Sequence, residues 1–428
     1  TKMQNIKFFE NWLKATPNLM GYANRRKKTK MERDRTILHC DLNGFYASVE
    51  ALSHPEIGGK PMAVCGDPKL RHGIILAKNE AAKKFGVSTG EPIFRAKRKC
   101  PDLILLEPHH EKYAEYSRKV NAIYARFTDR IEPFGIDESW LDVSASLSLF
   151  GGGAEIADKI RETVKSELGL TVSVGVSFNK TFAKLGSDYK KPDATTVFGR
   201  GQVETIIHKL PVGDMLFVGR STVETLRRMG IRTIGDLARA DEKFLVRRFG
   251  KFGKDLLAAA RGEENSPVAY YGEEDEAKSV GNSITFRRDL CGLADIRAGL
   301  EVVAEKVARR LMRDNIKCWV VHAAVKGADF SYMTRQMRLD KPVNSRRELI
   351  ETAEKLVRDN WDLSAPVRML GITGSSLAAA DTPVQGDLFA PPPETDKRNE
   401  KAESAFYKIR EKFGKDAIRF GTSLDSDL

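Results

Sequence analysis

The chain has 428 residues, with 71 lysines and arginines against 59 aspartates and glutamates and a formal net charge of +12. This length predicts several domains, and the positive charge favours a polyanionic partner that is bound in a salt-dependent way. No apolar run reaches about 18 residues, no signal-peptide pattern opens the chain, and the five cysteines show no CxxC spacing, so we expect a soluble cytoplasmic protein without membrane spans, disulfides or a zinc site.

Residues 1–34 combine aromatic side chains with a basic run, and we interpret them as a mobile N-terminal extension; a functional arm is the alternative. Residues 35–50 then read as a short apolar strand that delivers Asp41 at its end, followed by the aromatic pair Phe45 and Tyr46. The alternative is that this aromatic pair belongs to the hydrophobic core and has no role in binding.

Residues 51–110 form a small mixed segment that is rich in lysine and arginine. Residues 73–77 read as a strand and residues 80–84 as a helix that Gly86 ends. A strand that leads into a helix is suited to form one wall of a phosphate-binding site, and Lys83 lies on this helix. Without the neighbouring motifs, a generic charged surface helix would be the preferred interpretation.

Residues 134–143 place two adjacent acids, Asp137 and Glu138, in a segment that would otherwise be a buried strand. Both can serve one site only if the strand bends, bulges or ends there, because successive strand residues face opposite sides. Burying an ionised carboxylate without compensation costs several kcal/mol. We therefore expect the two acids to be exposed in a cleft, paired with bases or bound to a cation. If the strand bearing Asp41 is a neighbour, the three acids form a cluster of the kind that holds Mg²⁺ against a triphosphate. A solvated hairpin tip is the alternative.

The segments around these acids alternate between helix and strand. A helix is expected at 113–127, a second helix has its apolar face at positions 156, 160, 164 and 168, and valines alternate as a strand from 172 to 176. After that strand come Lys180, Lys184 and Lys191, for which a solvated lysine face is the alternative interpretation.

Residues 204–265 contain two candidate helix-hairpin-helix elements. In the first, a tight turn at Gly219, Arg220 and Ser221 leads into a helix whose first N–H groups could bind a DNA phosphate. The second, at 247–254, places two glycines among four bases. A helical subdomain without a DNA role stays open.

Residues 266–277 read as a linker, and a new module follows at 278–378. Its expected order is βαββαβ, which predicts a split sheet with helices on one face. This fold alone does not imply DNA binding, because it hosts many functions. The expected elements are strands at 278–286, 317–326, 330–339 and 366–377 and helices at 295–313 and 345–360.

Residues 379–428 are rich in Ala, Asp and Pro, and we expect a flexible tail with a short helix within 402–420. Inside the tail, Gln385, Leu388 and Phe389 form a short motif of an amide followed by two large apolar side chains.

Five motifs occur in the order in which they occur in Y-family translesion DNA polymerases of the DNA polymerase IV type, and the chain resembles that family from about residue 35 to 390. The motifs are DLNGFYASVE at 41–50, FGV at 85–87, GIDES at 135–139, VGVSFNKTFAK at 174–184 and KKP at 190–192.

The resemblance implies an α/β (α+β) right-hand polymerase. Its parts would be a palm (35–50 and 111–203), fingers (51–110), a thumb (204–265), the linker (266–277), a βαββαβ little finger (278–378) and the tail (379–428). It also implies template-directed translesion synthesis in DNA repair, in which a primer 3′-hydroxyl attacks a deoxynucleoside triphosphate. No proofreading motif is recognisable.

The resemblance also assigns the catalytic residues. Asp41, Asp137 and Glu138 would hold two Mg²⁺ ions, with Mn²⁺ as a possible substitute, and the Leu42 carbonyl would add a ligand. Tyr46 matches the steric gate, the ring that clashes with a ribose 2′-hydroxyl.

Further residues would contact the substrates. Phe45, Lys83 and Lys191 would join Tyr46 in nucleotide binding, and the motif at 385–389 would dock in the pocket of the sliding clamp. The partners are thus primer–template DNA, deoxynucleotides and the clamp, with no membrane and a monomeric state. The predicted DNA contacts are Lys180, Lys184, Gly219, Arg220, Ser221, Arg287, Arg288, Arg335 and Arg338.

The chain departs from the family in the fingers. Glu80 and Lys83 stand where relatives commonly carry a tyrosine and an arginine that contact the triphosphate, so we expect Glu80 to turn away or to pair with a base such as Lys84. Two other functions stay open: a non-catalytic adaptor at damaged DNA, and a nuclease or cyclase that uses the same three acids.

Overall fold

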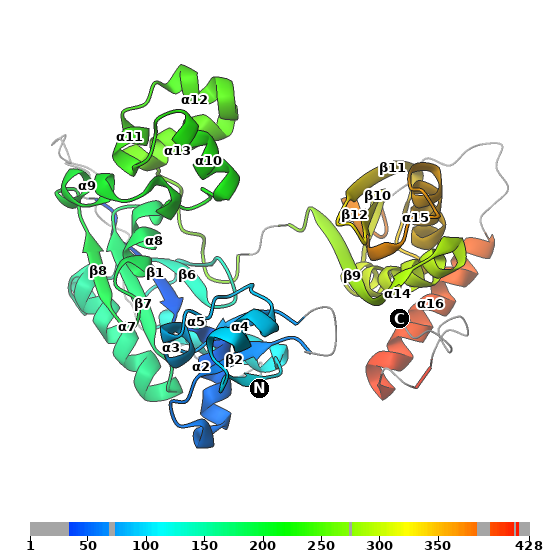
Figure 1. Cartoon of the computed structure of the whole chain (residues 1–428), viewed down its shortest axis with the longest axis horizontal. Coiled ribbons are helices and arrows are strands. Elements are labelled where there is room, and N and C mark those ends of the chain that lie inside the picture. Colours follow the sequence, from blue (N-terminus) through cyan, green and yellow to red (C-terminus); the bar gives the residue numbers. More distant parts are fainter. Residues whose placement is uncertain (1–33, 68–72, 274–275, 383–393, 415–416, 419–428) are drawn as a thin grey trace, which may run out of the picture.

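The computed structural model describes residues 34–67, 73–273, 276–382, 394–414 and 417–418. Its strands form three sheets of five, four and three strands, so the mixed α/β fold class is confirmed. In Figure 1 the elements up to α13 form one body, and those from β9 to α16 form a second. No helix within these described ranges is both long and apolar enough to cross a membrane.

The five-stranded sheet carries the predicted acids and corresponds to the expected palm. Its central strand β1 is buried along its whole length because helices cover both faces of the sheet. Leu38, Cys40 and Leu42 join the core under α5 and α7, whereas the alternate residues face α8. The strand order is β5 (Ile131–Pro133), β6 (Glu138–Asp142), β1 (Ile37–Leu42), β7 (Val172–Ser177) and β8 (Thr195–Phe198).

Helices surround this sheet where the apolar periodicity predicted them. α7 (Gly153–Leu168) buries Ile156, Ile160 and Val164, and α5 spans His110–Tyr124 rather than 113–127. α8 (Lys180–Tyr189) lies very close to the sheet, since a Cβ on Gly175 would collide with the backbone of α8 and a Cβ on Gly186 would lie 2.9 Å from Gly175 Cα. This close approach places Lys184 of α8 beside the strands that carry the acids.

A short turn leads from the palm to the expected fingers. Gly44 has φ of +53° between β1 and helix α2 (Phe45–Ser53), a backbone conformation that favours glycine. The fingers sheet has the order β3 (Ile75–Lys78), β2 (Met62–Cys65), β4 (Ile104–Leu106), and the predicted helix 80–84 is α3 (Glu80–Lys84). α4 (Ile93–Lys99) completes this part.

The expected thumb consists of short helices around one core that includes Leu226, Leu245 and Leu257. The helices are α9 (Gln202–Thr205), α10 (Arg220–Arg228), α11 (Ile234–Ala238), α12 (Glu242–Phe249) and α13 (Lys251–Arg261). Smaller elements elsewhere are α6 (Leu147–Phe150) and three 3-10 turns at Pro55–Ile57, Ile207–Lys209 and Val212–Asp214.

The second body confirms the predicted βαββαβ order. The sheet has the order β11-β10-β12-β9, and α14 and α15 pack against one of its faces. The elements are β9 (Ser279–Leu290), α14 (Gly292–Arg313), β10 (Ile316–Gly327), β11 (Tyr332–Val343), α15 (Arg346–Asn360) and β12 (Val367–Ala379).

The last segment contains a helix, as expected within 402–420, but the helix begins earlier and replaces part of the expected flexible tail. A helix, α16 (Glu394–Phe413), packs on the little finger and contributes Phe406 and Tyr407 to its core. The backbone N–H of Arg346 donates to Glu403 at 3.0 Å, and Arg410 pairs with Glu305 on α14. These aromatic and charged contacts fold the segment against α14 and α15, which composition alone did not reveal.

Candidate active site

The predicted acids come together at one end of the central strands. Asp41 of β1 is the register partner of Glu138, the first residue of β6, so the predicted strand neighbours are confirmed. Asp137 lies in the bend just before β6, and its carbonyl accepts a hydrogen bond of 3.0 Å from the Leu42 N–H. The strand therefore begins between the two adjacent acids, and this allows both to serve one site.

The charges in this cluster act strongly on one another. Burial and then the charges of Asp41 and Glu138 raise the pKa of Asp137 to about 6. Burial also opposes ionisation of Glu138, but contacts with His39 and Lys184 outweigh it and lower the pKa of Glu138 to about 2. The pKa values of these two adjacent acids thus differ because only Glu138 lies directly against His39 and Lys184.

Two lysines offset part of the negative charge of the acids. Lys184 Nζ lies 3.0 Å from Asp41 Oδ2 and 2.6 Å from Glu138 Oε2, and Lys191 Nζ lies 2.7 Å from Asp41 Oδ2. Asp188 contacts both ammonium groups, at 3.4 Å and 2.8 Å. The Lys184 ammonium group therefore contacts the carboxylates in this structure. The predicted DNA contact of Lys184 and the predicted nucleotide contact of Lys191 both stay predictions.

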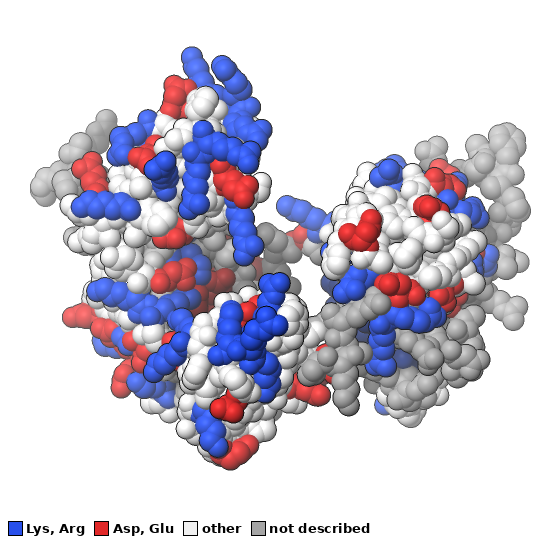
Figure 2. All heavy atoms as spheres, viewed as in Figure 1, with Lys and Arg blue, Asp and Glu red and all other residues white. Residues whose placement is uncertain are grey.

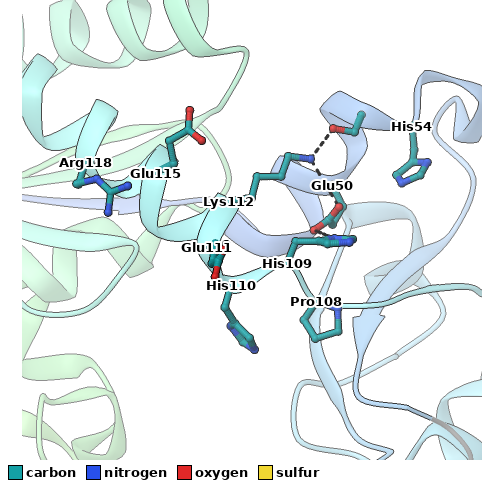
Figure 3. Close-up of a pocket in the computed structure, with 10 residues that line it drawn as sticks. Glu50, His54, Pro108, His109, His110, Glu111, Lys112, Glu115 and Arg118 are labelled. Atoms are coloured by element: carbon teal, nitrogen blue, oxygen red, sulfur yellow. Dashed lines mark hydrogen bonds and ion pairs between the residues drawn. The ribbon is translucent and has the colours of Figure 1, made fainter. Parts of the chain in front are cut away.

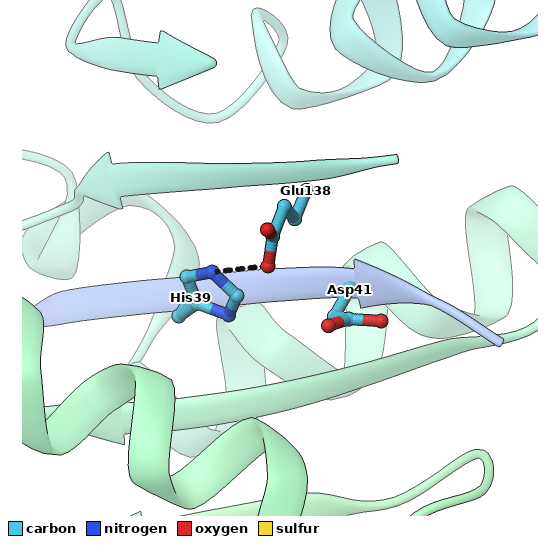
Figure 4. A group of neighbouring side chains, drawn as sticks. All are labelled: His39, Asp41 and Glu138. Carbon is cyan, nitrogen blue, oxygen red and sulfur yellow. Dashed lines mark ion pairs between the residues drawn. The ribbon is translucent and has the colours of Figure 1, made fainter. Parts of the chain in front are cut away.

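His39 is a residue of this cluster that the sequence reading missed. Figure 4 shows it beside Asp41 and Glu138, with ligand-type atoms of the three side chains all within 4.8 Å of one another. Its Nδ1 lies 2.8 Å from Ser187 Oγ and its Nε2 3.3 Å from Glu138 Oε2. The sequence could have predicted this position, because His39 stands two residues before Asp41 on the same strand and such residues face the same side of a sheet.

The donor set fits hard divalent cations. Carboxylate oxygens are the ligands that Mg²⁺ and Mn²⁺ prefer, and here Asp41, Asp137 and Glu138 offer them together. The two lysines face Asp41, Glu138 and Asp188 as well as the nearby Asp137, so they leave part of the negative charge of this cluster uncompensated. The acids are therefore arranged as a cation site.

The aromatic pair after β1 divides between core and surface. Phe45 is buried, so its side chain belongs to the core, as the alternative interpretation held. Tyr46 is partly exposed on α2 and stacks on Tyr113 of α5, with ring centroids 4.0 Å apart and an interplanar angle of 14°. The charge of Asp137, after burial, raises the pKa of Tyr46, so this ring lies near the acids.

In the fingers, Glu80 pairs with Lys83 and not with Lys84. Lys83 Nζ lies 3.3 Å from Glu80 Oε1, and both side chains are more than half exposed. An exposed pair of this kind is weak, so Lys83 can leave Glu80 for a stronger anion.

The predicted thumb contacts lie at the surface. Gly219, Arg220 and Ser221 are all exposed at the start of α10, where the helix presents its free N–H groups. Figure 2 shows Lys and Arg side chains gathered over the elements that Figure 1 labels α10 to α13. Lys180, in contrast, is 8% exposed and pairs with Glu132 at 2.5 Å, and its DNA contact stays a prediction.

The four arginines of the little finger that were predicted to contact DNA have different surroundings. Phe286 and Met337 point to the helix-covered face, so Arg287 and Arg338 point to the open face of the sheet. Arg338 lies over the Trp319 ring at 5.3 Å. The remaining two are held within the domain, because Arg288 pairs with Asp295 at 2.5 Å and Arg335 donates to Asn360 at 3.0 Å. The predicted clamp motif, Gln385 to Phe389, lies outside the described residues.

Two family models match the chain. The impB/mucB/samB family matches residues 40–188, and the C-terminal domain of the impB/mucB/samB family matches residues 277–388. The first match contains Asp41, Asp137 and Glu138, and the second contains the split sheet.

Relatives and a solved structure agree with these matches. The chain is 46% identical over 393 residues to DNA polymerase IV of Acetivibrio thermocellus, covering 91% of this chain and 98% of the relative. It is 36% identical over 399 residues to DNA polymerase IV 1 of Bacillus subtilis, covering 92% and 94%. A solved Y-family DNA polymerase chimera has the same fold, with a TM-score of 0.72 at 23% identity over 80% of this chain and 99% of that one. The chain therefore belongs to the impB/mucB/samB family, the family of the Y-family polymerases named DNA polymerase IV.

Proposed function

We propose that this chain is a DNA-directed DNA polymerase that carries out translesion synthesis by adding deoxynucleotides to a primer 3′ end. The single observation that carries the proposal is the cluster of Asp41, Asp137 and Glu138 where β1 ends and β6 begins. In a chain of this family, the presence of all three carboxylates at one place favours catalysis over the adaptor role. We also propose the domain boundaries given by the sequence for the palm, fingers, thumb and little finger.

The three acids would hold two Mg²⁺ ions, with the Leu42 carbonyl at the end of β1 as a further ligand. When bound, these ions would make the primer hydroxyl more acidic and stabilise the charge that develops on the phosphate oxygens. Lys191, next to Asp41, would contact the triphosphate, and Lys83 would reach it from the fingers. The Tyr46 ring would lie under the sugar and exclude a ribose 2′-hydroxyl.

The primer–template duplex would be held by its backbone. A cleft of about 460 Å³ is lined by Lys184, Asp188 and residues 214–219, so it runs from the acidic cluster to the start of α10. There the N–H groups of the helix and Arg220 would bind a phosphate without reading sequence. Arg287 and Arg338 on the open face of the little-finger sheet would add further phosphate contacts.

The remaining partners are also part of the proposal. Gln385, Leu388 and Phe389 would dock the chain on the sliding clamp, and the chain would act as a monomer in the cytoplasm. Kinship with proteins named DNA polymerase IV supports primer–template DNA and deoxynucleotides as the substrates.

Primer extension with Mg²⁺ on undamaged and lesion-bearing templates tests the proposal. The wild-type chain should extend both primers, and Asp137→Asn should abolish extension while duplex affinity stays nearly unchanged, because the acid serves the cations and not the DNA. DNA binding without extension by the wild-type chain would favour the adaptor. Normal turnover by the variant would refute the assignment of Asp137.

A further inference from the structure

A buried carboxylate outside the cation site lies behind the proposed steric gate. Glu50 is 1% exposed although it is ionisable, and it stands four residues after Tyr46 on α2. Residues four apart lie on the same face of a helix. Glu50 and Tyr46 therefore both face α5, the helix that carries Tyr113.

Tyr113 bridges the two. Its ring stacks on Tyr46, and its hydroxyl donates to Glu50 Oε1 at 2.5 Å. His110 meets both tyrosine rings edge-on, with centroid distances of 5.8 Å. The orientation of the Tyr113 ring is thus set at one end by a charged acceptor and at the other by the gate.

Other donors keep Glu50 in place. His109 Nδ1 lies 3.0 Å from Glu50 Oε1 and Lys112 Nζ lies 3.7 Å from Glu50 Oε2. Both donors line an open cleft of about 870 Å³, and Figure 3 shows the Glu50 carboxylate between them. Burial opposes ionisation, but these partners together with Tyr113 lower the pKa of Glu50, so the carboxylate stays charged at neutral pH.

We propose that Glu50 is a positioning residue for sugar selection, because through the Tyr113 hydroxyl it fixes the ring against which Tyr46 rests. The inference rests on the proposed role of Tyr46 as the steric gate. A gate that tells one hydroxyl from a hydrogen must be held to within about 0.5 Å, and the residues that lock its position share in the selectivity. Neither Glu50 nor the Tyr113 hydroxyl touches the nucleotide in this role.

The test compares ribonucleotide with deoxynucleotide incorporation in four variants. Tyr113→Phe keeps the ring and removes the hydroxyl, and Glu50→Gln keeps the shape and weakens the acceptor. We expect each to lower the selectivity for deoxynucleotides by about threefold to tenfold, since a hydrogen bond to a charged group contributes about a factor of ten or more. The Michaelis constants should change more than the turnover rate, because the ring positions the sugar and does no chemistry. Tyr46→Ala serves as the positive control.

Tyr407→Phe is the matched control, because Tyr407 is also a buried tyrosine with a hydroxyl contact, to the Glu305 carbonyl at 3.5 Å, but lies in the little finger. It should keep wild-type selectivity. If Tyr46→Ala changes selectivity while Tyr113→Phe and Glu50→Gln match the wild type, the inference about Glu50 is wrong. If Tyr46→Ala itself changes nothing, the proposed gate is wrong instead. Should either buried variant unfold, His109→Phe removes an exposed donor to the same carboxylate, and its unchanged selectivity would equally overturn the inference.

Discussion

Lys184 should act as an internal counter-charge that the cation site depends on when no metal is bound. Its ammonium group contacts Asp41 at 3.0 Å, Glu138 at 2.6 Å and Asp188 at 3.4 Å, and its side chain is 16% exposed. Burial disfavours the charge, yet the acids, Asp41 first, raise the pKa of Lys184. Replacing Lys184 by methionine keeps most of the unbranched side chain and removes the charged ammonium group.

Breaking a buried ion pair by removing one partner costs about 3–5 kcal/mol, because the other charge stays buried and unpaired. Here Lys191 still pairs with Asp41 at 2.7 Å and His39 stays beside Glu138, so we expect the lower end of that range. The body formed by the elements up to α13 has about 230 residues, and in a body of that size a loss of about 3 kcal/mol in the free energy of unfolding lowers Tm by about 6–12 °C. In metal-free buffer Lys184→Met should show this loss, and saturating Mg²⁺ should remove more than half of it, because a cation bound by the acids replaces the missing charge.

Calorimetric melting with and without Mg²⁺ measures the loss of Tm in Lys184→Met relative to the wild type. Hydrogen exchange of the β1 amides shows whether the transition belongs to the palm. Lys180→Met is the matched control, because Lys180 forms a similarly buried pair with Glu132 at 2.5 Å away from the cation site. Its loss of Tm should be equal in both buffers. A Lys184→Met variant that melts like the wild type without metal, or whose loss ignores Mg²⁺, would refute the reasoning.

Three further changes probe the proposed substrate and partner contacts. Lys83→Ala should raise the Michaelis constant for deoxynucleotides by about tenfold, roughly 1.4 kcal/mol. Glu80→Ala should leave that constant unchanged or lower it slightly, because it frees Lys83 from its ion pair. Steady-state kinetics in which the two effects were reversed would contradict this. Changing Leu388 and Phe389 to Ala should leave synthesis on short primers unchanged and remove stimulation by the clamp, since tethering only raises the local concentration of the enzyme at the primer end; equal stimulation would dismiss the motif. Arg220→Gln should weaken duplex binding regardless of sequence and reduce the slope of log affinity against log salt by about one, and an unchanged slope in titrations would place Arg220 away from phosphate.

The sequence by itself determined the order and type of the main elements, because these depend on local periodicity. The spacing of Ile156, Ile160 and Val164 marks a helix face whatever that face packs on, and the βαββαβ order follows from the same kind of pattern. The acids could be predicted for a related reason. Asp41 at the end of an apolar strand, and Asp137 and Glu138 inside another, have no local explanation, so they pointed to a shared site.

Only the tertiary structure decided which charged groups face each other. Lys180 and Lys184 are four residues apart on one helix and look equivalent in the sequence, yet one pairs with Glu132 and the other enters the acidic cluster. Gly175 lets α8 approach the sheet closely. One turn apart on that helix, Lys180 meets Glu132 of β5 and Lys184 meets Asp41 of β1 and Glu138 of β6. Periodicity reports which face of a helix is buried, but the partner of a buried charge comes from a distant segment and depends on how the elements pack.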